Sequence, residues 1–151
     1  MEIVEYSTCS EKDKYFKQIA AYEWKAAKFL TTLLKENRLQ DALGSWGELY
    51  LLVDGDVLIS FVTLSAQDCI AAPNLTLTPW LGFFHTAPEY RGNRYGKLLI
   101  DGVCEFARKD NYNKIYIATD HIGLYEKYGF KYLENRIDIW GEDSRIYVKE
   151  I

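Results

Sequence analysis

The sequence predicts one α/β domain in which a mixed, twisted sheet lies between helices. Stretches of alternating or β-branched apolar residues, typical of strands, are separated by stretches whose apolar residues recur at helical spacing. A chain of 151 residues has the usual length of one domain, and no repeat, low-complexity tract or linker divides it. We therefore expect a single domain over residues 1–151, with elements in the order βααβββαβαββ.

The first elements are a short strand over residues 3–6 and a helical region over residues 11–36, with Ser10 as the expected N-cap. The helical region has one broad apolar face, and a break near Ala20 would divide it into two helices. That face consists of Tyr15, Ile19, Tyr22, Ala26, Phe29, Leu30, Leu33 and Leu34. We expect a loop over residues 37–47.

A β-hairpin follows, formed by strands over residues 48–53 and 57–64. Asp54-Gly55-Asp56 joins these strands, and Asp-Gly between two apolar runs is a strong hairpin signal. Residues 65–78 are less regular, and Ala71-Ala72-Pro73-Asn74 indicates a loop before the next strand.

The stretch from Trp80 to Lys109 carries the main functional signal. An apolar run over residues 80–84 predicts a strand, and a helix is expected from Tyr95 onward. The apolar stripe of this helix is Tyr95, Leu98, Leu99, Gly102, Val103 and Phe106. Between them lies the basic loop Arg91-Gly92-Asn93-Arg94-Tyr95-Gly96. A loop that leads onto a helix N-terminus presents unpaired backbone N–H groups and the positive end of the helix dipole, which favour an anion.

Two common anion-binding loops do not fit this stretch. The phosphate loop of nucleotide hydrolases needs four residues between its glycines and Ser or Thr after its lysine, whereas Gly92 and Gly96 are separated by three residues and Leu98 follows Lys97. The dinucleotide fingerprint needs three glycines spaced G-x-G-x-x-G, and only Gly92 and Gly96 are present.

The lead-in Pro88-Glu89-Tyr90-Arg91-Gly92, with Gly96 at the end of the loop, resembles the acetyl-CoA loop of the GNAT family of N-acetyltransferases. That loop has Arg or Gln, two residues, Gly, one residue, and Gly or Ala, so Arg91 takes the first position and Gly96 the last. Arg94 departs from the pattern, because the family usually has glycine there. Since a residue in the first turn of a helix needs no positive φ, we expect Arg94 to be tolerated and to add a cation beside the phosphates.

A second stretch, correctly spaced downstream, supports the resemblance. Residues 114–119 alternate and are β-branched, as in a strand. The octet Gly123-Leu-Tyr-Glu-Lys-Tyr-Gly-Phe130 is similar to the family's terminal signature, a short helix that ends in a glycine cap, here Gly129. Two closing strands are expected over residues 131–140 and 144–149.

The resemblance implies that the central parallel strands, ending at Thr86 and Thr119, splay apart at their C-terminal ends. The helix that begins at Tyr95 would join these strands by a right-handed crossover. In the family this opening admits the pantetheine arm of acetyl-CoA, whose amides would pair with the backbone of Phe84 and Thr86. The loop residues assigned to acetyl-CoA in this way are Arg91, Gly92, Asn93, Arg94, Tyr95, Gly96 and Lys97.

Acetyl transfer from a thioester to an amine needs an acid that protonates the departing thiolate. Tyr125 occupies the motif position of the family's tyrosine, and we assign it as the general acid and as part of the cofactor site. The base stays open among several residues and a water relay, with His121, just beyond a strand end, the first to test. The residues considered as base are Glu48, Asp68, His85, Asp120 and His121.

The resemblance implies an N-acetyltransferase that moves an acetyl group from acetyl-CoA to a primary amine, without a metal. A small amine, an antibiotic, an amino acid, a peptide N-terminus and a protein lysine all stay open as acceptors. In the family the region between the first two strands borders the acceptor pocket, where Tyr22 and Trp24 could touch substrate. Two other hypotheses are a non-catalytic acetyl-CoA-binding sensor or scaffold, and an acyltransferase that uses a longer acyl-CoA in a pocket beyond Gly82.

Charge and cysteine content limit which partners and which cellular compartment we expect for the protein. A formal net charge of −4 argues against nucleic acid or an anionic membrane as the main partner, and no run of about 18 apolar residues or signal-like N-terminus occurs. Cys9, Cys69 and Cys104 lack metal-ligand spacing, and we expect free thiols in a reducing cytoplasm. We expect a monomer, or a homodimer paired through an exposed closing strand such as residues 146–149.

Overall fold

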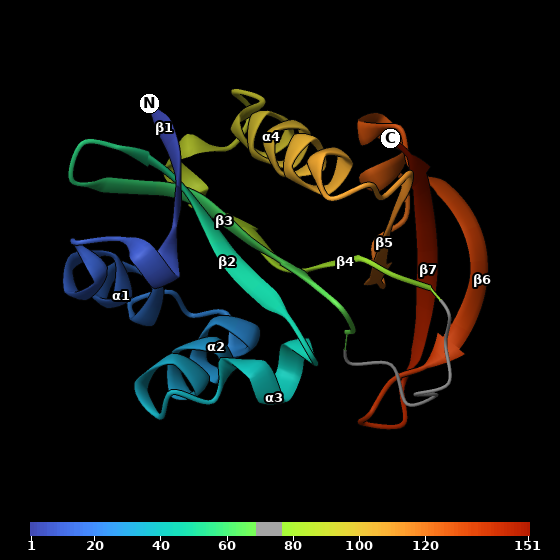
Figure 1. Cartoon of the computed structure of the whole chain (residues 1–151), viewed down its shortest axis with the longest axis horizontal. Helices are drawn as coiled ribbons and strands as arrows, with labels where there is room; N and C mark the ends of the chain where they lie inside the picture. The colour runs from blue at the N-terminus through green and yellow to red at the C-terminus, as the bar shows by residue number, and fades with distance from the viewer. Residues whose placement is uncertain (69–76) are drawn as a thin grey trace.

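The computed structural model describes residues 1–68 and 77–151, which form a seven-stranded sheet with helices on both faces (Figure 1). The strand order is β1-β2-β3-β4-β5-β7-β6, and every pair of neighbours is antiparallel except β4 and β5. The strands are β1 (Glu2–Glu5), β2 (Gly47–Asp54), β3 (Val57–Ser65), β4 (Trp80–Thr86), β5 (Lys114–Thr119), β6 (Lys131–Ile137) and β7 (Asp143–Glu150). This mixed sheet between helices confirms the predicted fold class.

Helices α1, α2 and α3 lie on one side of the sheet, and α4 lies on the other (Figure 1). The α-helices are α1 (Lys12–Ala20), α2 (Lys25–Lys35), α3 (Leu39–Leu43) and α4 (Tyr95–Lys109). Three short 3₁₀ helices complete the described structure: η1 (Tyr6–Thr8), η2 (Pro88–Tyr90) and η3 (Tyr125–Tyr128). Because α4 connects the two parallel strands, its N-terminus follows the end of β4 and its C-terminus precedes β5.

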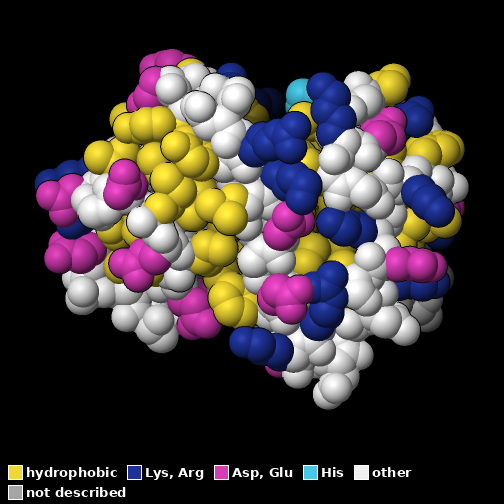
Figure 2. Space-filling model, turned by 90° about the horizontal axis from the view of Figure 1, so that it is seen from above, with side chains coloured by type: hydrophobic (Ala, Val, Ile, Leu, Met, Phe, Trp, Pro, Cys, Tyr) yellow, Lys and Arg dark blue, Asp and Glu magenta, His cyan; other side chains and the backbone are white. Residues whose placement is uncertain are grey.

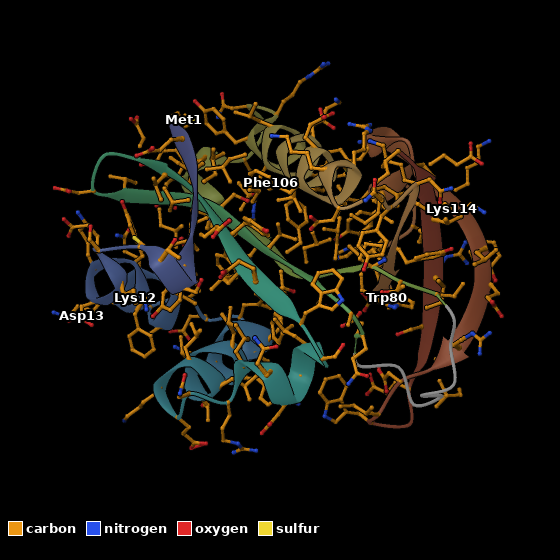
Figure 3. All side chains as sticks on the ribbon, in the orientation of Figure 1. Met1, Lys12, Asp13, Trp80, Phe106 and Lys114 are labelled. Atoms are coloured by element: carbon orange, nitrogen blue, oxygen red, sulfur yellow. The ribbon has the colours of Figure 1, made fainter. Side chains whose placement is uncertain are left out.

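The sheet separates two apolar cores, which explains why helices are needed on both faces. The core beneath α4 includes Leu52, Leu81, Leu99, Val103 and Ile117. The core beneath α1 and α2 includes Ile19, Leu30, Leu49, Leu51 and Phe61. Figure 3 shows side chains filling the space between α4, which carries the labelled Phe106, and the sheet. Burial of each such side chain contributes about 1.5–3 kcal/mol, so both faces of the sheet are firmly held.

The N-terminal half differs from expectation at two points. Ser10 does not cap the first helix: Glu11 is its N-cap residue, and the Glu11 side chain makes no capping hydrogen bond. Residues 37–47 contain the short helix α3 instead of only a loop, because Leu39 and Leu43 lie on one face and Leu43 is buried. The predicted break in the first helical region is confirmed, since α1 ends at Ala20.

The buried stripes of two helices are rotated from the predicted ones. In α4, Leu98 is 50% exposed, and the buried residues are Gly96, Leu99, Ile100, Val103, Cys104 and Ala107. In α2, Phe29 is 40% exposed and Ala27 is buried. Both helices place small residues against the sheet, which lets the helix backbone approach closely and leaves some large apolar side chains at the rim.

The hairpin, the later strands and the glycine cap are confirmed. Gly55 has a φ of +59° in the turn between β2 and β3, and Gly129 ends η3 in the left-handed region with a φ of +92°. The proposal that residues 146–149 form an exposed edge is wrong, because β7 pairs with β5 on one side and β6 on the other. The edge strands of this sheet are β1 and β6.

Cys9 and Cys104 are free thiols. Cys69 and the predicted loop over residues 71–74 lie outside the described residues. In the part of the chain that the structure describes, no helix is long and apolar enough to cross a membrane.

Candidate active site

The two central strands separate after a short parallel contact. Trp80 pairs with Tyr116 and Leu81 with Ile117, and these are the parallel pairs between β4 and β5 within the described residues. Between the pairs Phe61–His85 and Thr63–Gly82, one residue of β3 lies opposite two residues of β4, so β4 contains a β-bulge. Phe83 lies in this bulge with a φ of +50°. The predicted opening between the parallel strands is therefore present beyond Leu81.

The bulge decides which part of β4 faces the opening. The backbone N–H of Ala87 donates to the carbonyl of Ile59, and the carbonyl of His85 accepts from Ser60 Oγ, so both β4-side groups face β3. Because backbone groups alternate along a strand, those of Phe84 and Thr86 face the opposite edge. These are the two residues that, by the family resemblance, would pair with a pantetheine arm.

The N-terminus of α4 lies beside this edge and leaves several N–H groups without helical partners. Arg94 is the N-cap residue, and the first backbone hydrogen bond of the helix runs from the Leu98 N–H to the Arg94 carbonyl. The N–H groups of Tyr95, Gly96 and Lys97 precede that bond and point out of the helix end. Together with the helix dipole they form a site suited to a phosphate group.

The expectation that Arg94 would have a negative φ, as a residue in the first helical turn, is wrong. Its φ is +61° and its ψ is 20°, which is the left-handed region that glycine adopts without strain. The expectation failed because Arg94 is the residue before the first helical turn and not a residue within it. Among residues 1–68 and 77–151, no acidic side chain pairs with its exposed guanidinium.

The loop ahead of α4 is held by its own side chains. Arg91 Nε donates to the Thr86 carbonyl over 3.0 Å, and Asn93 Nδ2 donates to the Tyr90 carbonyl over 3.1 Å. Gly92 has a φ of +85°, and a Cβ there would meet open space. Lys97 Nζ lies 2.6 Å from Asp101 Oδ2, so its charge is already partly balanced. Figure 2 shows Lys and Arg side chains gathered near the middle of the face over α4, beside a hollow.

Gly96 is the point where β4, α4 and η3 meet. A Cβ on Gly96 would lie 2.7 Å from Phe84 Cζ, 3.2 Å from Thr86 Oγ1 and 3.4 Å from the Tyr128 hydroxyl. A contact of 2.7 Å between carbon atoms is too short to be accommodated without movement. Gly96 is therefore required by packing, in addition to any role of its N–H group.

Tyr125 is the first residue of η3, and it is only 5% exposed beside Phe84. Its ring packs against Phe84 at 6.2 Å and edge-on against Phe130 at 5.9 Å, measured between ring centroids. Burial raises the pKa of Tyr125 well above its ordinary value, and the negative charges of Asp120 and Asp68 add to the effect. The phenol is thus protonated at neutral pH, and no described residue forms a hydrogen bond with its hydroxyl.

Tyr128 belongs to the same cluster and was not singled out from the sequence. Its ring is edge-on to Phe84 at 6.2 Å, and burial raises the pKa of its phenol. Residues three apart in a 3₁₀ turn eclipse one another, so the spacing of Tyr125 and Tyr128 was the signal that could have found it.

The structure separates the residues that were considered as base. Glu48 accepts hydrogen bonds from the backbone N–H and the hydroxyl of Ser7, and its strand, β2, is separated from β5 by β3 and β4. Asp68 and Asp120 are close enough to raise the pKa of Tyr125. His121 has an exposed side chain, and its N–H donates to Thr119 Oγ1 over 3.0 Å.

His85 lies among aromatic rings on the face of β4 that points away from α4. Its ring stacks on Trp24 at 5.0 Å and lies 4.6 Å from Tyr22, and its buried Nε2 has no partner among the described residues. Burial lowers the pKa of His85 to about 4, with a smaller contribution from the charge of Arg91. The imidazole is therefore neutral at pH 7. Tyr22 and Trp24, which were predicted to border the acceptor, lie against it.

Comparisons with known proteins show the family to which the chain belongs. A sequence model of the acetyltransferase (GNAT) family matches residues 9–130, which is most of the chain, whereas no curated protein matches it. The chain belongs to the GNAT acetyltransferase family.

Solved structures show the same fold over nearly the whole chain. An acetyltransferase from Streptococcus agalactiae is 25% identical, covers 99% of this chain and 98% of its own, and has a TM-score of 0.67. A GNAT acetyltransferase from Elizabethkingia anophelis with acetyl-CoA bound is 18% identical, with coverages of 99% and 97% and a TM-score of 0.67. The aminoglycoside 6'-N-acetyltransferase from Enterococcus faecium is 16% identical, with the same coverages and a TM-score of 0.68.

Proposed function

We propose that the protein transfers the acetyl group of acetyl-CoA to a primary amine of a small molecule or peptide. The observation that carries the proposal is Tyr125, a buried and protonated phenol that lies against Phe84 at the opening between β4 and β5. A phenol without a hydrogen-bond partner among the described residues, placed at such an opening, is suited to donate its proton to a bound group.

The chain offers acetyl-CoA two sets of contacts. The backbone of Phe84 and the N–H group of Thr86 face away from β3 and can pair with amide groups, whereas the Thr86 carbonyl already accepts from Arg91. The N–H groups of Tyr95, Gly96 and Lys97 can receive a pyrophosphate. Arg91 and Gly92 shape the loop, Asn93 closes it, and Arg94 adds a positive charge. No metal is part of this proposal.

The chemistry follows from these positions. Bound acetyl-CoA supplies an acetyl group as a thioester. A neutral amine forms the new N–C bond, the C–S bond breaks, and Tyr125 gives its proton to the sulfur. The amine releases one proton during this exchange, and Tyr125 is reprotonated from water. His121 is the first residue to test as the group that receives the amine proton. Asp68 and Asp120 are alternatives, because both are close enough to Tyr125 to raise the pKa of its phenol.

A direct assay tests the proposal. Purified protein is incubated with acetyl-CoA and a panel of amines, including an aminoglycoside because one structural neighbour acetylates that class. We expect equimolar release of CoA thiol and formation of an acetylated amine, detected by mass spectrometry. Binding of acetyl-CoA without acetylation of any amine would favour the sensor or scaffold hypothesis, and a faster reaction with a longer acyl-CoA would favour the other acyltransferase.

A further inference from the structure

The sheet ends in two unlike edge strands, β1 and β6 (Figure 1). An edge strand presents backbone N–H and C=O groups that can pair with a strand of another chain. β1 has four residues, with Glu2 and Glu5 at its ends. Antiparallel pairing of β1 with β1 of a second copy would place each Glu2 opposite a Glu5, and like charges directly opposite are destabilising. β6 is longer, with seven residues, and carries charges of both signs.

Apolar side chains are exposed along β6 and the turn that follows it. Five of the ten exposed large apolar side chains of the described residues lie within residues 132–140. On β6 itself, Leu133 is 44% exposed and Ile137 is 52% exposed. Apolar side chains on an unpaired edge favour association with another strand, so β6 is the edge suited to a partner.

The backbone of β6 offers this partner a regular outer edge. The Asp138 N–H donates to the Glu142 carbonyl over 2.8 Å, so the backbone of Asp138 faces the β7 side of the hairpin. Because backbone groups alternate along a strand, the backbone of Arg136 faces the same side, whereas those of Asn135 and Ile137 face outward. No described strand pairs with this outer edge, because β6 is the last strand of the sheet.

The charges of β6 select one antiparallel register with a second copy. With Asn135 opposite Asn135, each Glu134 lies opposite an Arg136 and each Leu133 opposite an Ile137. Opposite charges and apolar pairs stabilise a sheet. The neighbouring registers that keep the outward groups paired place either Glu134 opposite Glu134 or Arg136 opposite Arg136. Like charges disfavour both, so the Asn135-centred register is the complementary one.

Glu134 and Arg136 can contact a second copy without losing their contact within the chain. Arg136 Nη2 lies 3.2 Å from Glu134 Oε1, and the two side chains are 30% and 42% exposed, respectively. A guanidinium has five donors and a carboxylate has two acceptor oxygens, so one contact leaves both able to bind a further partner. In this register they form non-hydrogen-bonded pairs, in which Cα atoms approach to about 4.5 Å and side chains are closest. The dimer would therefore hold four charges of alternating sign.

We propose that the protein forms a symmetric homodimer in which β6 pairs with β6 of a second copy, antiparallel and centred on Asn135. The two seven-stranded sheets then continue as one sheet. This proposal does not depend on the proposed acetyl transfer. β6 contributes seven residues per copy, fewer than the about 20–30 of a standard interface, so we expect a micromolar dissociation constant.

Sedimentation equilibrium from about 1 µM to about 500 µM protein tests the association. We expect the wild type to change from monomer to dimer over this range. Arg136→Glu places a glutamate opposite Glu134 and should raise the dissociation constant about tenfold or more. Lys131→Glu is the matched control, because it makes the same change of charge on β6 outside the complementary pairs, and it should stay within about twofold of the wild type.

Reversal of both charges tests the register. Glu134→Arg combined with Arg136→Glu restores opposite charges across the two copies and should return the dissociation constant to within about threefold of the wild type. Circular dichroism and urea unfolding check that each variant is folded. A folded double variant that dimerises no better than Arg136→Glu would overturn the charge complementarity.

Two changes at Asn135 separate its backbone from its side chain. Asn135→Pro removes the outward N–H at the centre of the dimer, and proline is tolerated on an edge strand where this N–H faces solvent. It should abolish dimerisation, whereas Asn135→Ala keeps the N–H and should not.

Cysteine cross-linking measures the register directly. Asn135→Cys should form a disulfide between copies on mild oxidation, because Cα atoms of a hydrogen-bonded pair lie about 5.5 Å apart. Leu133→Cys should not, because its two copies would lie more than about 13 Å apart. The wild type controls for the native cysteines.

Three results would overturn the proposal. One is a wild type that stays monomeric over the whole concentration range. Another is a dimer that neither Arg136→Glu nor Asn135→Pro weakens. The third is cross-linking through Leu133→Cys in preference to Asn135→Cys, since the strands would then pair in a register without the Glu134–Arg136 contacts.

Discussion

The two faces of β4 were built in different ways. The face toward α4 joins Phe84, Gly96 and Tyr125, which belong to two stretches that already stand out in the sequence. The opposite face joins Gly82 and Phe83 with residues of β3, α2 and the turn between β6 and β7. The first face therefore depends on local backbone geometry, whereas the second depends on how distant elements pack together.

This difference indicates how function is divided across the strand. A cofactor face made of short motifs can stay the same while the opposite face changes with single residues of the surrounding helices and turns. We expect substitutions on the α4 face to affect chemistry and cofactor binding, and those on the other face to affect the acceptor and stability.

Tyr125→Phe should have the largest effect. The change keeps the ring and its packing but removes the proton that the departing sulfur takes, so turnover should fall about 10²–10⁴-fold. Affinity for acetyl-CoA, measured by calorimetry, should change little. Because burial raises the pKa of Tyr125, the wild-type rate should stay high to above pH 10 before it declines.

The matched control for that change is Tyr128→Phe, which removes the other phenol of η3 from the same cluster. Its turnover should stay within a few-fold of the wild type. If Tyr128→Phe were the slower variant, the general acid would be Tyr128, and Tyr125 would be only a wall of the cleft.

Gly96→Ala should destabilise the fold. Its Cβ would lie 2.7 Å from Phe84 Cζ, so α4 or the Phe84 ring must shift, at a cost of about 1–3 kcal/mol in the free energy of unfolding. Urea unfolding measures this change. Leu98→Ala, at a 50% exposed position of the same helix, should cost clearly less, and equal costs would show that Gly96 has no special packing role.

His85, on the face of β4 that points away from α4, should make the free energy of unfolding depend on pH. Its pKa is lowered to about 4 in the folded state, so the unfolded state binds a proton first as the pH falls below about 6.5. The stabilisation is present above pH 6.5 and is lost as the pH falls toward 4, by about 1–3 kcal/mol.

Urea unfolding at pH 7.5, 5.5 and 4.5 would measure the His85 effect, with His85→Phe as the comparison. His85→Phe keeps an aromatic ring beside Trp24 and removes the titration, so its stability should fall less over this range. Parallel pH dependence in the two proteins would mean that other groups cause the loss.

Arg94→Gly should give the smallest change in stability, in the opposite direction. Glycine adopts a φ of +61° without strain, so the variant should gain about 0.5–1 kcal/mol in thermal or urea unfolding. If the guanidinium contacts a phosphate of acetyl-CoA, affinity should fall by about 1–3 kcal/mol at the same time. Unchanged or tighter binding would show that Arg94 is only a tolerated replacement for glycine.

Elements that depend on a few adjacent residues could be predicted from the sequence. The Asp54-Gly55 turn, the strand over residues 114–119 and the Gly129 cap each depend on a few adjacent residues, and all are present. The α4 N-terminus was predicted as well, but the φ of Arg94 was not, because the first residue of a helix cannot be fixed to one position by periodicity.

The opposite face could not be predicted, because its residues meet only in the folded chain. Phe29 was placed on the apolar face of the first helical region but is 40% exposed, since helical periodicity finds an apolar face but not how far that face is rotated toward the sheet. Thr63 and Trp140 carry no motif, and their neighbours depend on the bulge in β4 and on the turn after β6.

Hydrogen exchange of individual backbone amides, followed by NMR with and without acetyl-CoA, tests the central claim most directly. The claim is that acetyl-CoA lies along the free edge of β4 and on the N-terminus of α4. Exchange at Phe84, Tyr95 and Gly96 should slow about tenfold or more when acetyl-CoA is added, while exchange at Phe29 and Trp140 stays unchanged. Protection confined to Phe29 and Trp140, or none at Phe84 and Gly96 despite binding, would contradict the account.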